Sequence, residues 1–367
     1  MQRDELAAWL RLLETPQVGR ESARKLLAAF GSPQAVLAAS TAALREVVGL
    51  VTAAALEQPN EGLADLVEAT VQWLSAGSDD VPRHVITLGD PQYPTALLET
   101  ADPPLLLYLQ GNAALLAKPC VAVVGSRNPT PQGSENARAF STHLSQAGLT
   151  VVSGLALGID GAAHEGGLAG TGKTVAVVGT GLDRVYPRKH LELAHRIAKQ
   201  GLVVSEYSLG TPPLPPNFPM RNRIIAGLAR GTLVVEAALQ SGSLITARLA
   251  SEAGRDVFAI PGSIHSPQSR GCHALIKQGA KLVDSAQDIL EELQWGVSPS
   301  ASLADRASES GANPLLDALG FDPVNLDALM ARTGLSSSQL SADLLDLELA
   351  GQVARLPGQL FQRVSTG

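Results

Sequence analysis

The chain has 367 residues, 45% of them hydrophobic and 17% charged, so composition excludes a disordered protein and length allows two or three domains. Its two cysteines, Cys120 and Cys272, exclude a disulfide framework and a four-cysteine zinc site. No apolar run reaches the roughly 18 residues of a membrane-spanning helix, and the acidic N-terminus shows no signal peptide. We therefore expect a cytoplasmic protein without membrane contact.

Charge is distributed unevenly along the chain. The net charge of −7, taken alone, argues against nucleic-acid binding. Residues 118–292 nevertheless hold 17 Lys and Arg against 13 Asp and Glu, whereas residues 1–117 and 293–367 have balances of −7 and −4. The middle of the chain is therefore the expected binding region for a polyanion.

Residues 1–80 are expected to form a helical domain. Apolar residues recur at helical spacing between residues 4 and 75, and a Gly-containing turn at Thr15–Gly19 separates two short helical patterns. This arrangement resembles a helix-hairpin-helix or sterile-alpha-motif-like bundle, whose turn can offer backbone N–H groups to a phosphate. Because the segment is acidic, we favour a packing role over contact with DNA.

Residues 84–292 alternate between short β-rich runs and helical patterns. The near-continuous apolar character of the runs suits strands that are buried on both faces of a sheet. The fold class is therefore α/β, an extended Rossmann-like, doubly wound parallel sheet that binds ligands at the carboxyl ends of its strands. The expected strands are Cys120–Val124, Leu149–Val152, Thr174–Val178, Leu202–Val204, Thr232–Val235 and Val257–Ile260.

Residues 293–313 are interpreted as a linker, and residues 314–367 as a winged-helix-like domain. Two helical patterns flank the turn Thr333–Ser336, where Ser336 or Ser337 is the expected N-cap, and a hairpin follows over Gly351–Phe361. Acidic residues outnumber basic ones in this segment. We therefore favour a packing or protein-contact role for it over DNA reading.

Three loops that follow predicted strands suit phosphate binding. Gly125-Ser126-Arg127 comes directly after the first strand, Ser241-Gly242-Ser243 precedes a helical pattern, and Asp183–His190 is a basic cluster that contains Arg188. Helix N-termini and guanidinium groups both bind phosphate oxygens. The alternative is a plain turn whose arginine pairs with a carboxylate, but the position at the expected ligand edge favours a functional role.

Residues that suit nucleic-acid binding are most concentrated at the start of an amphipathic helix, after a Pro-rich loop. An aromatic ring beside arginines suits a stacked base next to a phosphate. The alternative places the ring in the core and pairs the arginines with Glu206 or Glu236. With the other loops, this segment predicts a basic ridge along one sheet edge rather than a single pocket. The residues concerned are Phe218, Arg221, Asn222 and Arg223.

Several motifs are rejected on context. Gly167–Thr174 matches the P-loop expression, but a helical pattern precedes it and a strand follows it, so we expect a helix-to-strand turn and no ATP site. Val124–Gly133 and Gly179–Gly181 do not complete the dinucleotide fingerprint. His164 lacks a nucleophile at a recognisable elbow, so a structural role is favoured. We predict no catalytic residue, cofactor or metal site.

Taken together, these segments resemble the DNA-processing protein A family (DprA, also called Smf), over residues 84–285. The resemblance implies an extended Rossmann domain that binds single-stranded DNA, protects incoming DNA, forms homodimers and helps to load the RecA recombinase during natural transformation. It also matches Arg127, Arg188 and Phe218 to positions tied to strand binding. The motifs that carry it are Asp90–Pro94, Asp102–Leu105, Gly125–Arg127, Ser153–Asp160, Gly179–Asp183, Tyr186–Pro187, Arg221–Ile225 and Ser241–Ser243.

The leading hypothesis is a non-enzymatic single-stranded DNA-binding protein. Its phosphates would bind helix N-termini at Gly125–Arg127 and Ser241–Ser243, while the arginines supply charge and Phe218 a stacking face. The alternative is a nucleotide phosphoribohydrolase of the lysine-decarboxylase-like Rossmann type, with Glu236 as acid or base. A third hypothesis is a scaffold that makes protein contacts through its acidic end domains.

Overall fold

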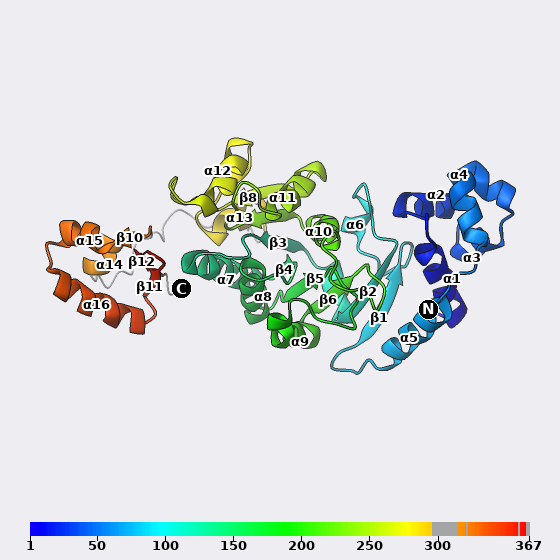
Figure 1. Ribbon diagram of the computed structural model, residues 1–367, viewed down its shortest axis with the longest axis horizontal. Coiled ribbons are helices and arrows are strands. Elements are labelled where there is room, and N and C mark those ends of the chain that lie inside the picture. Colours follow the sequence, from blue (N-terminus) through cyan, green and yellow to red (C-terminus); the bar gives the residue numbers. More distant parts are fainter. Residues whose placement is uncertain (296–313, 321, 359, 365–367) are drawn as a thin grey trace.

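The computed structural model describes residues 1–295, 314–320, 322–358 and 360–364, and it contains the three predicted parts (Figure 1). These are an N-terminal helical domain, a central α/β domain and a C-terminal winged-helix domain. Within the described ranges, no helix combines the length and apolarity needed to cross a membrane.

Five helices form the N-terminal domain, as the 3.6-residue periodicity predicts. Leu10 and Leu12 of the first helix and Leu26 of the second are completely buried. The first two helices flank the predicted hairpin, whose Gly19 is the N-cap of the second helix. The helices are α1 (Arg3–Glu14), α2 (Arg20–Phe30), α3 (Pro33–Ala38), α4 (Thr41–Glu57) and α5 (Leu63–Ser75).

A nine-stranded sheet in the order β1-β2-β6-β5-β4-β3-β7-β8-β9 forms the centre of the molecule. All six predicted strands are present and pair in parallel with one another. The prediction of a wholly parallel sheet is corrected at one end, where β2 pairs antiparallel with β6 and β1 pairs antiparallel with β2. The strands are β1 (Arg83–Thr87), β2 (Leu106–Gly111), β3 (Cys120–Val124), β4 (Thr150–Ser153), β5 (Thr174–Val177), β6 (Leu202–Ser205), β7 (Gly231–Val234), β8 (Asp256–Ala259) and β9 (Lys281–Leu282).

Both faces of the sheet are covered. Along β3, Val121 and Val123 belong to one hydrophobic core while Ala122 and Val124 belong to another, since successive side chains point to opposite faces. This double burial explains the apolar runs that predicted the strands. The helices of the domain are α6 (Thr95–Leu98), α7 (Pro131–Gln146), α8 (Ile159–Ala169), α9 (Leu191–Gln200), α10 (Asn217–Leu228), α11 (Ser243–Glu252), α12 (Arg270–Lys277) and α13 (Ala286–Glu292), with 3₁₀ turns η1 (Ala113–Ala117), η2 (Arg188–His190) and η3 (Pro267–Ser269).

The rejected P-loop segment is the predicted turn. Gly167 lies inside α8, and the chain turns through residues 170–173 into β5. A side chain at Gly172 would overlap the carbonyl of Leu149, so the turn packs directly against a neighbouring loop. No helix N-terminus follows the glycines, and the phosphate-binding geometry of a P-loop is therefore absent from this segment.

The N-terminal helices pack against the β1 and β2 end of the sheet (Figure 1). Trp73 of α5 meets Tyr108 of β2 edge-to-face, with ring centroids 5.9 Å apart. The guanidinium of Arg83 lies 5.2 Å from the centre of the Trp73 ring. One hydrophobic cluster contains residues from both domains, so the helical domain and the sheet share a core.

The C-terminal domain has the predicted helix-turn-helix and hairpin. Ser336 is the N-cap of the second long helix and forms a capping box with Gln339. Residues 296–313 of the predicted linker lie outside the described residues, whereas Leu293 is buried and the Trp295 Nε1 donates to the Ala147 carbonyl. The elements are α14 (Pro314–Leu319), β10 (Val324–Asn325), α15 (Leu326–Thr333), α16 (Ser337–Leu349), β11 (Val353–Leu356) and β12 (Leu360–Arg363).

Candidate nucleic-acid interface

A hollow of about 560 Å³ opens at the carboxyl edge of the sheet, beyond the end of β3. Three separate segments supply most of its lining: the loop between β3 and α7, the first turns of α10, and the loop that leads into α11. Ala156, Asp160 and Gln268 complete it. The sequence analysis singled out all three segments, which lie far apart along the chain. The predicted site residues in its lining are Gly125, Ser126, Arg127, Phe218, Arg221, Asn222, Ser241, Gly242 and Ser243.

A cluster of one cation and two aromatic rings stands at the rim of this hollow. The guanidinium carbon of Arg127 lies 5.8 Å from the centre of the Phe218 ring. On the same ring, Tyr186 packs at a centroid distance of 5.4 Å and an interplanar angle of 33°. Arg127 is exposed, and Tyr186 is 48% exposed, so both present free surface. Arg127 makes no ion pair with any described residue, and its charge is therefore available to a ligand.

A smaller hollow of about 80 Å³ continues from the rim cluster. Its lining shares Arg127, Phe218 and Arg221 with the larger hollow and adds Tyr186 and Pro187. The two hollows share Arg127, Phe218 and Arg221 and are therefore neighbours at the sheet edge. Such an arrangement suits an extended ligand better than a compact one.

Close backbone packing holds the Arg127 loop in place. The amide of Ile159, at the start of α8, donates to the Ser126 carbonyl at 3.1 Å. Gly158 has φ 82° and stands so near that a side chain would overlap the same carbonyl. A glycine is therefore required at position 158 for both conformation and space. A Cβ at Gly125 would in turn lie 2.7 Å from the Ile159 Cγ1.

Arg221 lies at the floor of both hollows and is only 4% exposed. Its Nη1 donates to the Gly154 carbonyl at 2.6 Å and to the carbonyl of Val177. Burial lowers the pKa of Arg221 to about 10, with the nearby Asp160 carboxyl acting in the opposite direction. The expectation that Arg221 presents its charge at the surface is therefore corrected: it is buried, binds the ends of two strands together and shares the lining of the larger hollow with the Asp160 carboxyl.

The prediction for Arg223 is also corrected. Its Nε donates to the Asp102 Oδ2 at 2.8 Å and its Nη2 to the Glu206 Oε2 at 2.5 Å. These contacts realise the alternative in which an arginine of this helix pairs with Glu206. Arg223 lines neither hollow and offers no uncompensated charge to them. Arg188, in η2, is exposed beside Pro187 but likewise lines neither hollow.

The two predicted helix N-termini differ in the structure. Ser243 is the first residue of α11, and the hydroxyls of Ser241 and Ser243 lie 2.7 Å apart, as expected for a polar helix start. Gly125–Arg127, in contrast, belongs to a loop, because α7 begins only at Pro131. Asn222 connects α10 to the Ser241–Ser243 loop by donating its Nδ2 to the Gly242 carbonyl at 3.4 Å.

Glu236 and His164, the side chains that a hydrolase would use, already make hydrogen bonds within the chain. Glu236 accepts from the Thr130 amide at 2.9 Å and from the Thr130 hydroxyl at 2.6 Å, and burial raises the pKa of Glu236. It therefore caps α7 and does not line the hollow at the Arg127 rim. His164 is fully buried between Leu155 and Thr174, and burial lowers its pKa to about 3, so it is a neutral structural residue.

Tyr186 is the main residue that sequence reasoning left out of the site. In the sequence, Tyr186 stands out only as part of a family motif. It is nevertheless an aromatic residue in a basic cluster, and this combination indicates base stacking. Gln268, which lines the larger hollow and donates to the Asn128 carbonyl at 3.1 Å, had no comparable signal. Only the fold brings residue 268 next to residue 128.

Comparison with known families agrees with this division of the chain. A family described as DNA recombination-mediator protein A matches residues 84–294, the DprA winged helix domain matches residues 299–359, and the DprA-like N-terminal HHH domain matches residues 3–46. Protein Smf of Escherichia coli K12 is 44% identical over 302 residues, which are 80% of this chain and 79% of the relative. DNA processing protein DprA of Streptococcus pneumoniae R6 is 53% identical over 206 residues, 56% of this chain and 73% of the relative.

Two solved structures are similar to this chain. DNA processing protein A from Streptococcus pneumoniae superposes with a TM-score of 0.68 at 40% identity and covers 78% of this chain and 97% of its own. The Helicobacter pylori protein, solved for its single-stranded DNA binding mode, has a TM-score of 0.53 at 32% identity and covers 57% and 96%. With the family match across the whole α/β domain, these similarities confirm the resemblance stated above. The chain belongs to the DprA/Smf family of DNA recombination-mediator proteins.

Proposed function

We propose that this chain binds single-stranded DNA along the carboxyl edge of its sheet. One observation carries the proposal: an exposed Arg127, which forms no ion pair within the part of the chain that the structure describes, stands over the Phe218 ring, and this ring also packs against the exposed Tyr186. The Helicobacter pylori relative, solved for its single-stranded DNA binding mode, supports the same class of ligand.

The chemistry of the rim matches a single strand rather than a duplex. Unpaired bases expose their faces and stack on aromatic rings, whereas bases in a duplex are already stacked on each other. Arg127 and Arg188 would neutralise phosphates, and the serine loop at Ser241–Ser243 would donate hydrogen bonds to them. No step in this function makes or breaks a covalent bond, and we propose a non-enzymatic role.

The test is a salt titration with oligothymidine and a duplex of the same length. We expect the logarithm of the affinity to fall linearly with the logarithm of salt concentration, and the duplex to bind more weakly. Replacing Arg127 with Ala should weaken binding and lower the salt slope by about 1. Equal affinities of Arg127→Ala and the unchanged chain would remove Arg127 from the site.

We propose further that bound strands are protected and passed to the RecA recombinase during natural transformation. This role rests on family membership. The measurement is the rate of RecA-catalysed ATP hydrolysis on oligothymidine coated with single-strand-binding protein, with and without this chain. Unchanged rates would end this proposal while leaving DNA binding intact.

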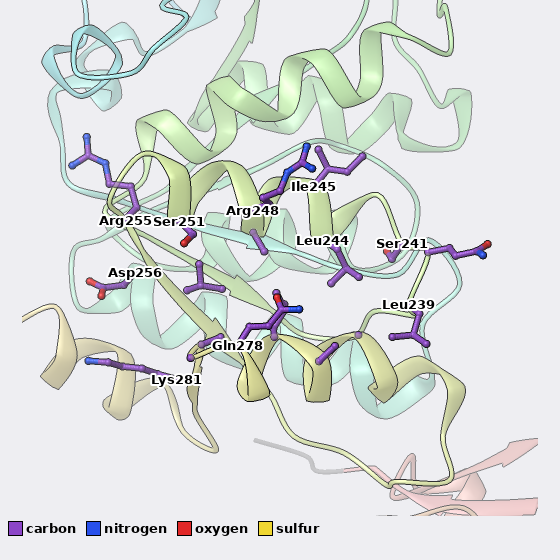
Figure 2. Close-up of a pocket in the computed structure, with 18 residues that line it drawn as sticks. Leu239, Ser241, Leu244, Ile245, Arg248, Ser251, Arg255, Asp256, Gln278 and Lys281 are labelled. Atoms are coloured by element: carbon purple, nitrogen blue, oxygen red, sulfur yellow. The ribbon is translucent and has the colours of Figure 1, made fainter.

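A homodimer is the third part of the proposal, with the second copy at the β9 edge. β9 is the last strand of the sheet, and its Leu282 is a 53% exposed apolar side chain at the open edge beside Lys281. Next to it, a hollow of about 700 Å³ lies between α11 and α12, where Leu244 projects between the two helices (Figure 2).

Sedimentation velocity tests the dimer surface. Leu282→Glu should convert the dimer into a monomer, because two carboxylates would face each other in an apolar contact. Leu98→Glu, which changes a leucine that is 51% exposed on α6, is the matched control and should leave the dimer intact. A dimer that survives Leu282→Glu would place the second copy elsewhere.

A further inference from the structure

Five charged side chains connect the N-terminal domain to the central domain. Asp102 accepts from the Arg223 Nε at 2.8 Å and the Arg20 Nε at 3.0 Å, and its other oxygen pairs with Arg24. Glu206 pairs with the Arg223 Nη2 at 2.5 Å and the Arg20 Nη1 at 3.4 Å. Two carboxylates of the central domain therefore hold two arginines of α2 and one arginine of α10 at the same time.

This network is far less exposed than an ordinary surface ion pair. The side chains of Glu206 and Arg223 are 7% and 12% exposed, and those of Asp102, Arg20 and Arg24 lie between 23% and 30%. Removing one member of a shielded network leaves its partners without compensation, which costs more than the loss of an exposed pair. The five groups are therefore expected to act as one unit.

The helix that this network grips is the helix that carries the DNA rim. Phe218, Arg221 and Asn222 of α10 line the hollow, and Arg223 is the next residue along the same helix. A rigid helix transmits a shift of Arg223 to Phe218, which is little more than one turn away. The packing of the Phe218 ring between Arg127 and Tyr186 depends on that placement.

The hairpin of the N-terminal domain faces the central domain through the same contact. Arg20 is the first residue of α2, directly after the hairpin, and its guanidinium is engaged by Asp102 and Glu206. On the other side of the hairpin, the Glu14 carboxylate accepts from the Ser208 hydroxyl at 2.6 Å. Glu14 and Arg20, which lie on the two sides of the hairpin, therefore both contact the central domain.

We propose that the helix-hairpin-helix is an intramolecular clamp: through Asp102 and Glu206 it holds α10 in the position that binds DNA, and Arg223 is a positioning residue for the rim. The inference rests on the proposed function, because it assigns the N-terminal domain a role in the same binding site. It predicts that docking of the N-terminal domain and binding of a single strand are coupled, each favouring the other.

Two substitutions that change the net charge in opposite directions distinguish the clamp from long-range electrostatic attraction of DNA. Asp102→Asn removes a negative charge near the rim, so long-range attraction of phosphates alone would tighten DNA binding. The clamp predicts the reverse, a loss of about fivefold or more in oligothymidine affinity, which is the usual size of coupling between two sites. Arg24→Gln leaves α10 untouched and should weaken binding in the same direction.

The controls match the charge change. Arg138→Gln removes one positive charge from an ion pair with Glu135 and Glu165 on α7 and α8, away from the network and the rim. Its affinity should stay within about twofold of the unchanged chain, because such exposed pairs contribute little. The difference in oligothymidine affinity between Arg24→Gln and Arg138→Gln therefore reports the docking of the N-terminal domain, because both variants lose the same charge.

Amide hydrogen exchange on the full-length chain gives the second readout. Without DNA, Arg24→Gln should speed exchange in α10 relative to Arg138→Gln. In the unchanged chain, saturating oligothymidine should slow exchange in α2, and Arg24→Gln should abolish this effect. If Asp102→Asn fails to fold, these comparisons remain interpretable, because they depend on Arg24→Gln, which changes a residue of the N-terminal domain.

The outcomes also separate this inference from the proposed function. If the unchanged chain binds oligothymidine while Asp102→Asn and Arg24→Gln bind as tightly as Arg138→Gln, the clamp is refuted and the function stands. If the unchanged chain binds no single strand, the proposed function fails, and exchange in α10 still decides whether the N-terminal domain positions that helix. Equal exchange in Arg24→Gln and Arg138→Gln would refute the clamp in either case.

Discussion

Three consecutive residues of α10 have three different environments. Arg221 is buried and binds strand-end carbonyls, Asn222 reaches the serine loop, and Arg223 enters an ion-pair network with the N-terminal domain. Residues that are one position apart on a helix point about 100° apart, which is enough to reach separate surfaces. Equal positive charge at positions 221 and 223 therefore says little about which residue is free for a ligand.

At the scale of single residues, we predict that the aromatic rings of Phe218 and Tyr186 contribute to DNA affinity by stacking on bases. Phe218→Ala and Tyr186→Ala should each lower oligothymidine affinity by about 1–3 kcal/mol, the usual contribution of one stacked base. Tyr186→Phe keeps the ring and should bind within about twofold of the unchanged chain. Fluorescence anisotropy at fixed salt measures all three, and an unaffected Tyr186→Ala would exclude that ring from DNA contact.

Strand ends and the loops that follow them determine the shape of the interface. The loop after β4 passes so close to α10 that Gly154 has no room for a side chain beside the Arg221 guanidinium. This contact joins β4 to α10, and the Arg221 hydrogen bond to Val177 joins both to β5. The floor of the hollow at Arg221 is thus part of the packing between elements.

Gly154→Ala should accordingly destabilise the fold by about 1–3 kcal/mol, the usual cost of overpacking a filled site. Gly242→Ala is the control, because a Cβ at Gly242 meets no atom within 4 Å. Chemical denaturation compares the two free energies of unfolding. Equal stability of Gly154→Ala and the unchanged chain would mean that Arg221 can move aside without loss.

The second long helix of the winged-helix domain, α16, has an unusual charge for a DNA reader. It contains no Lys or Arg, and its Asp343, Asp346 and Glu348 are exposed, so it repels phosphates. A chain that ends after Trp295 should therefore bind oligothymidine within about twofold of the full chain. A loss greater than about tenfold would show that residues 296–367 take part in binding.

On the scale of the whole molecule, docking of the N-terminal domain should depend on pH through Asp102. Burial opposes ionisation of this carboxyl, but Arg223, Arg20 and Arg24 outweigh burial and hold its pKa below the usual value. A carboxyl whose pKa is lowered by folding stabilises the folded state above its unfolded pKa of about 4. That contribution disappears as the pH falls through the lowered pKa of the folded state.

We therefore expect Asp102→Asn to lower the melting temperature at pH 7 and to lose this effect progressively below about pH 4. The destabilisation at neutral pH should be on the order of 1–3 kcal/mol, since the group is partly exposed. Calorimetry at matched ionic strength measures it, with Glu252→Gln in an exposed pair as control. A melting-temperature difference that persists unchanged to pH 3 would assign the effect to packing rather than charge.

The sequence alone determined the α/β architecture, the order of the three domains and the segments that line the hollow at the sheet edge. Buried parallel strands need continuous apolar runs, and helices need 3.6-residue periodicity, so both leave a local signal. The antiparallel pairing of β1 and β2 leaves no such signal, because an apolar run such as Leu106–Leu109 does not specify its neighbour.

Tertiary structure alone decided the role of each charged side chain. The sequence offered Arg127, Arg188, Arg221 and Arg223 as equivalent cations. Arg127 and Arg188 are exposed and pair with no carboxylate of the described residues, whereas Arg221 is buried and Arg223 is paired. Asp102 and Tyr186 lie 121 and 32 positions from the α10 residues that they contact. Periodicity and motif spacing are local properties, whereas charge compensation and ring contacts depend on residues that only the folded chain brings together.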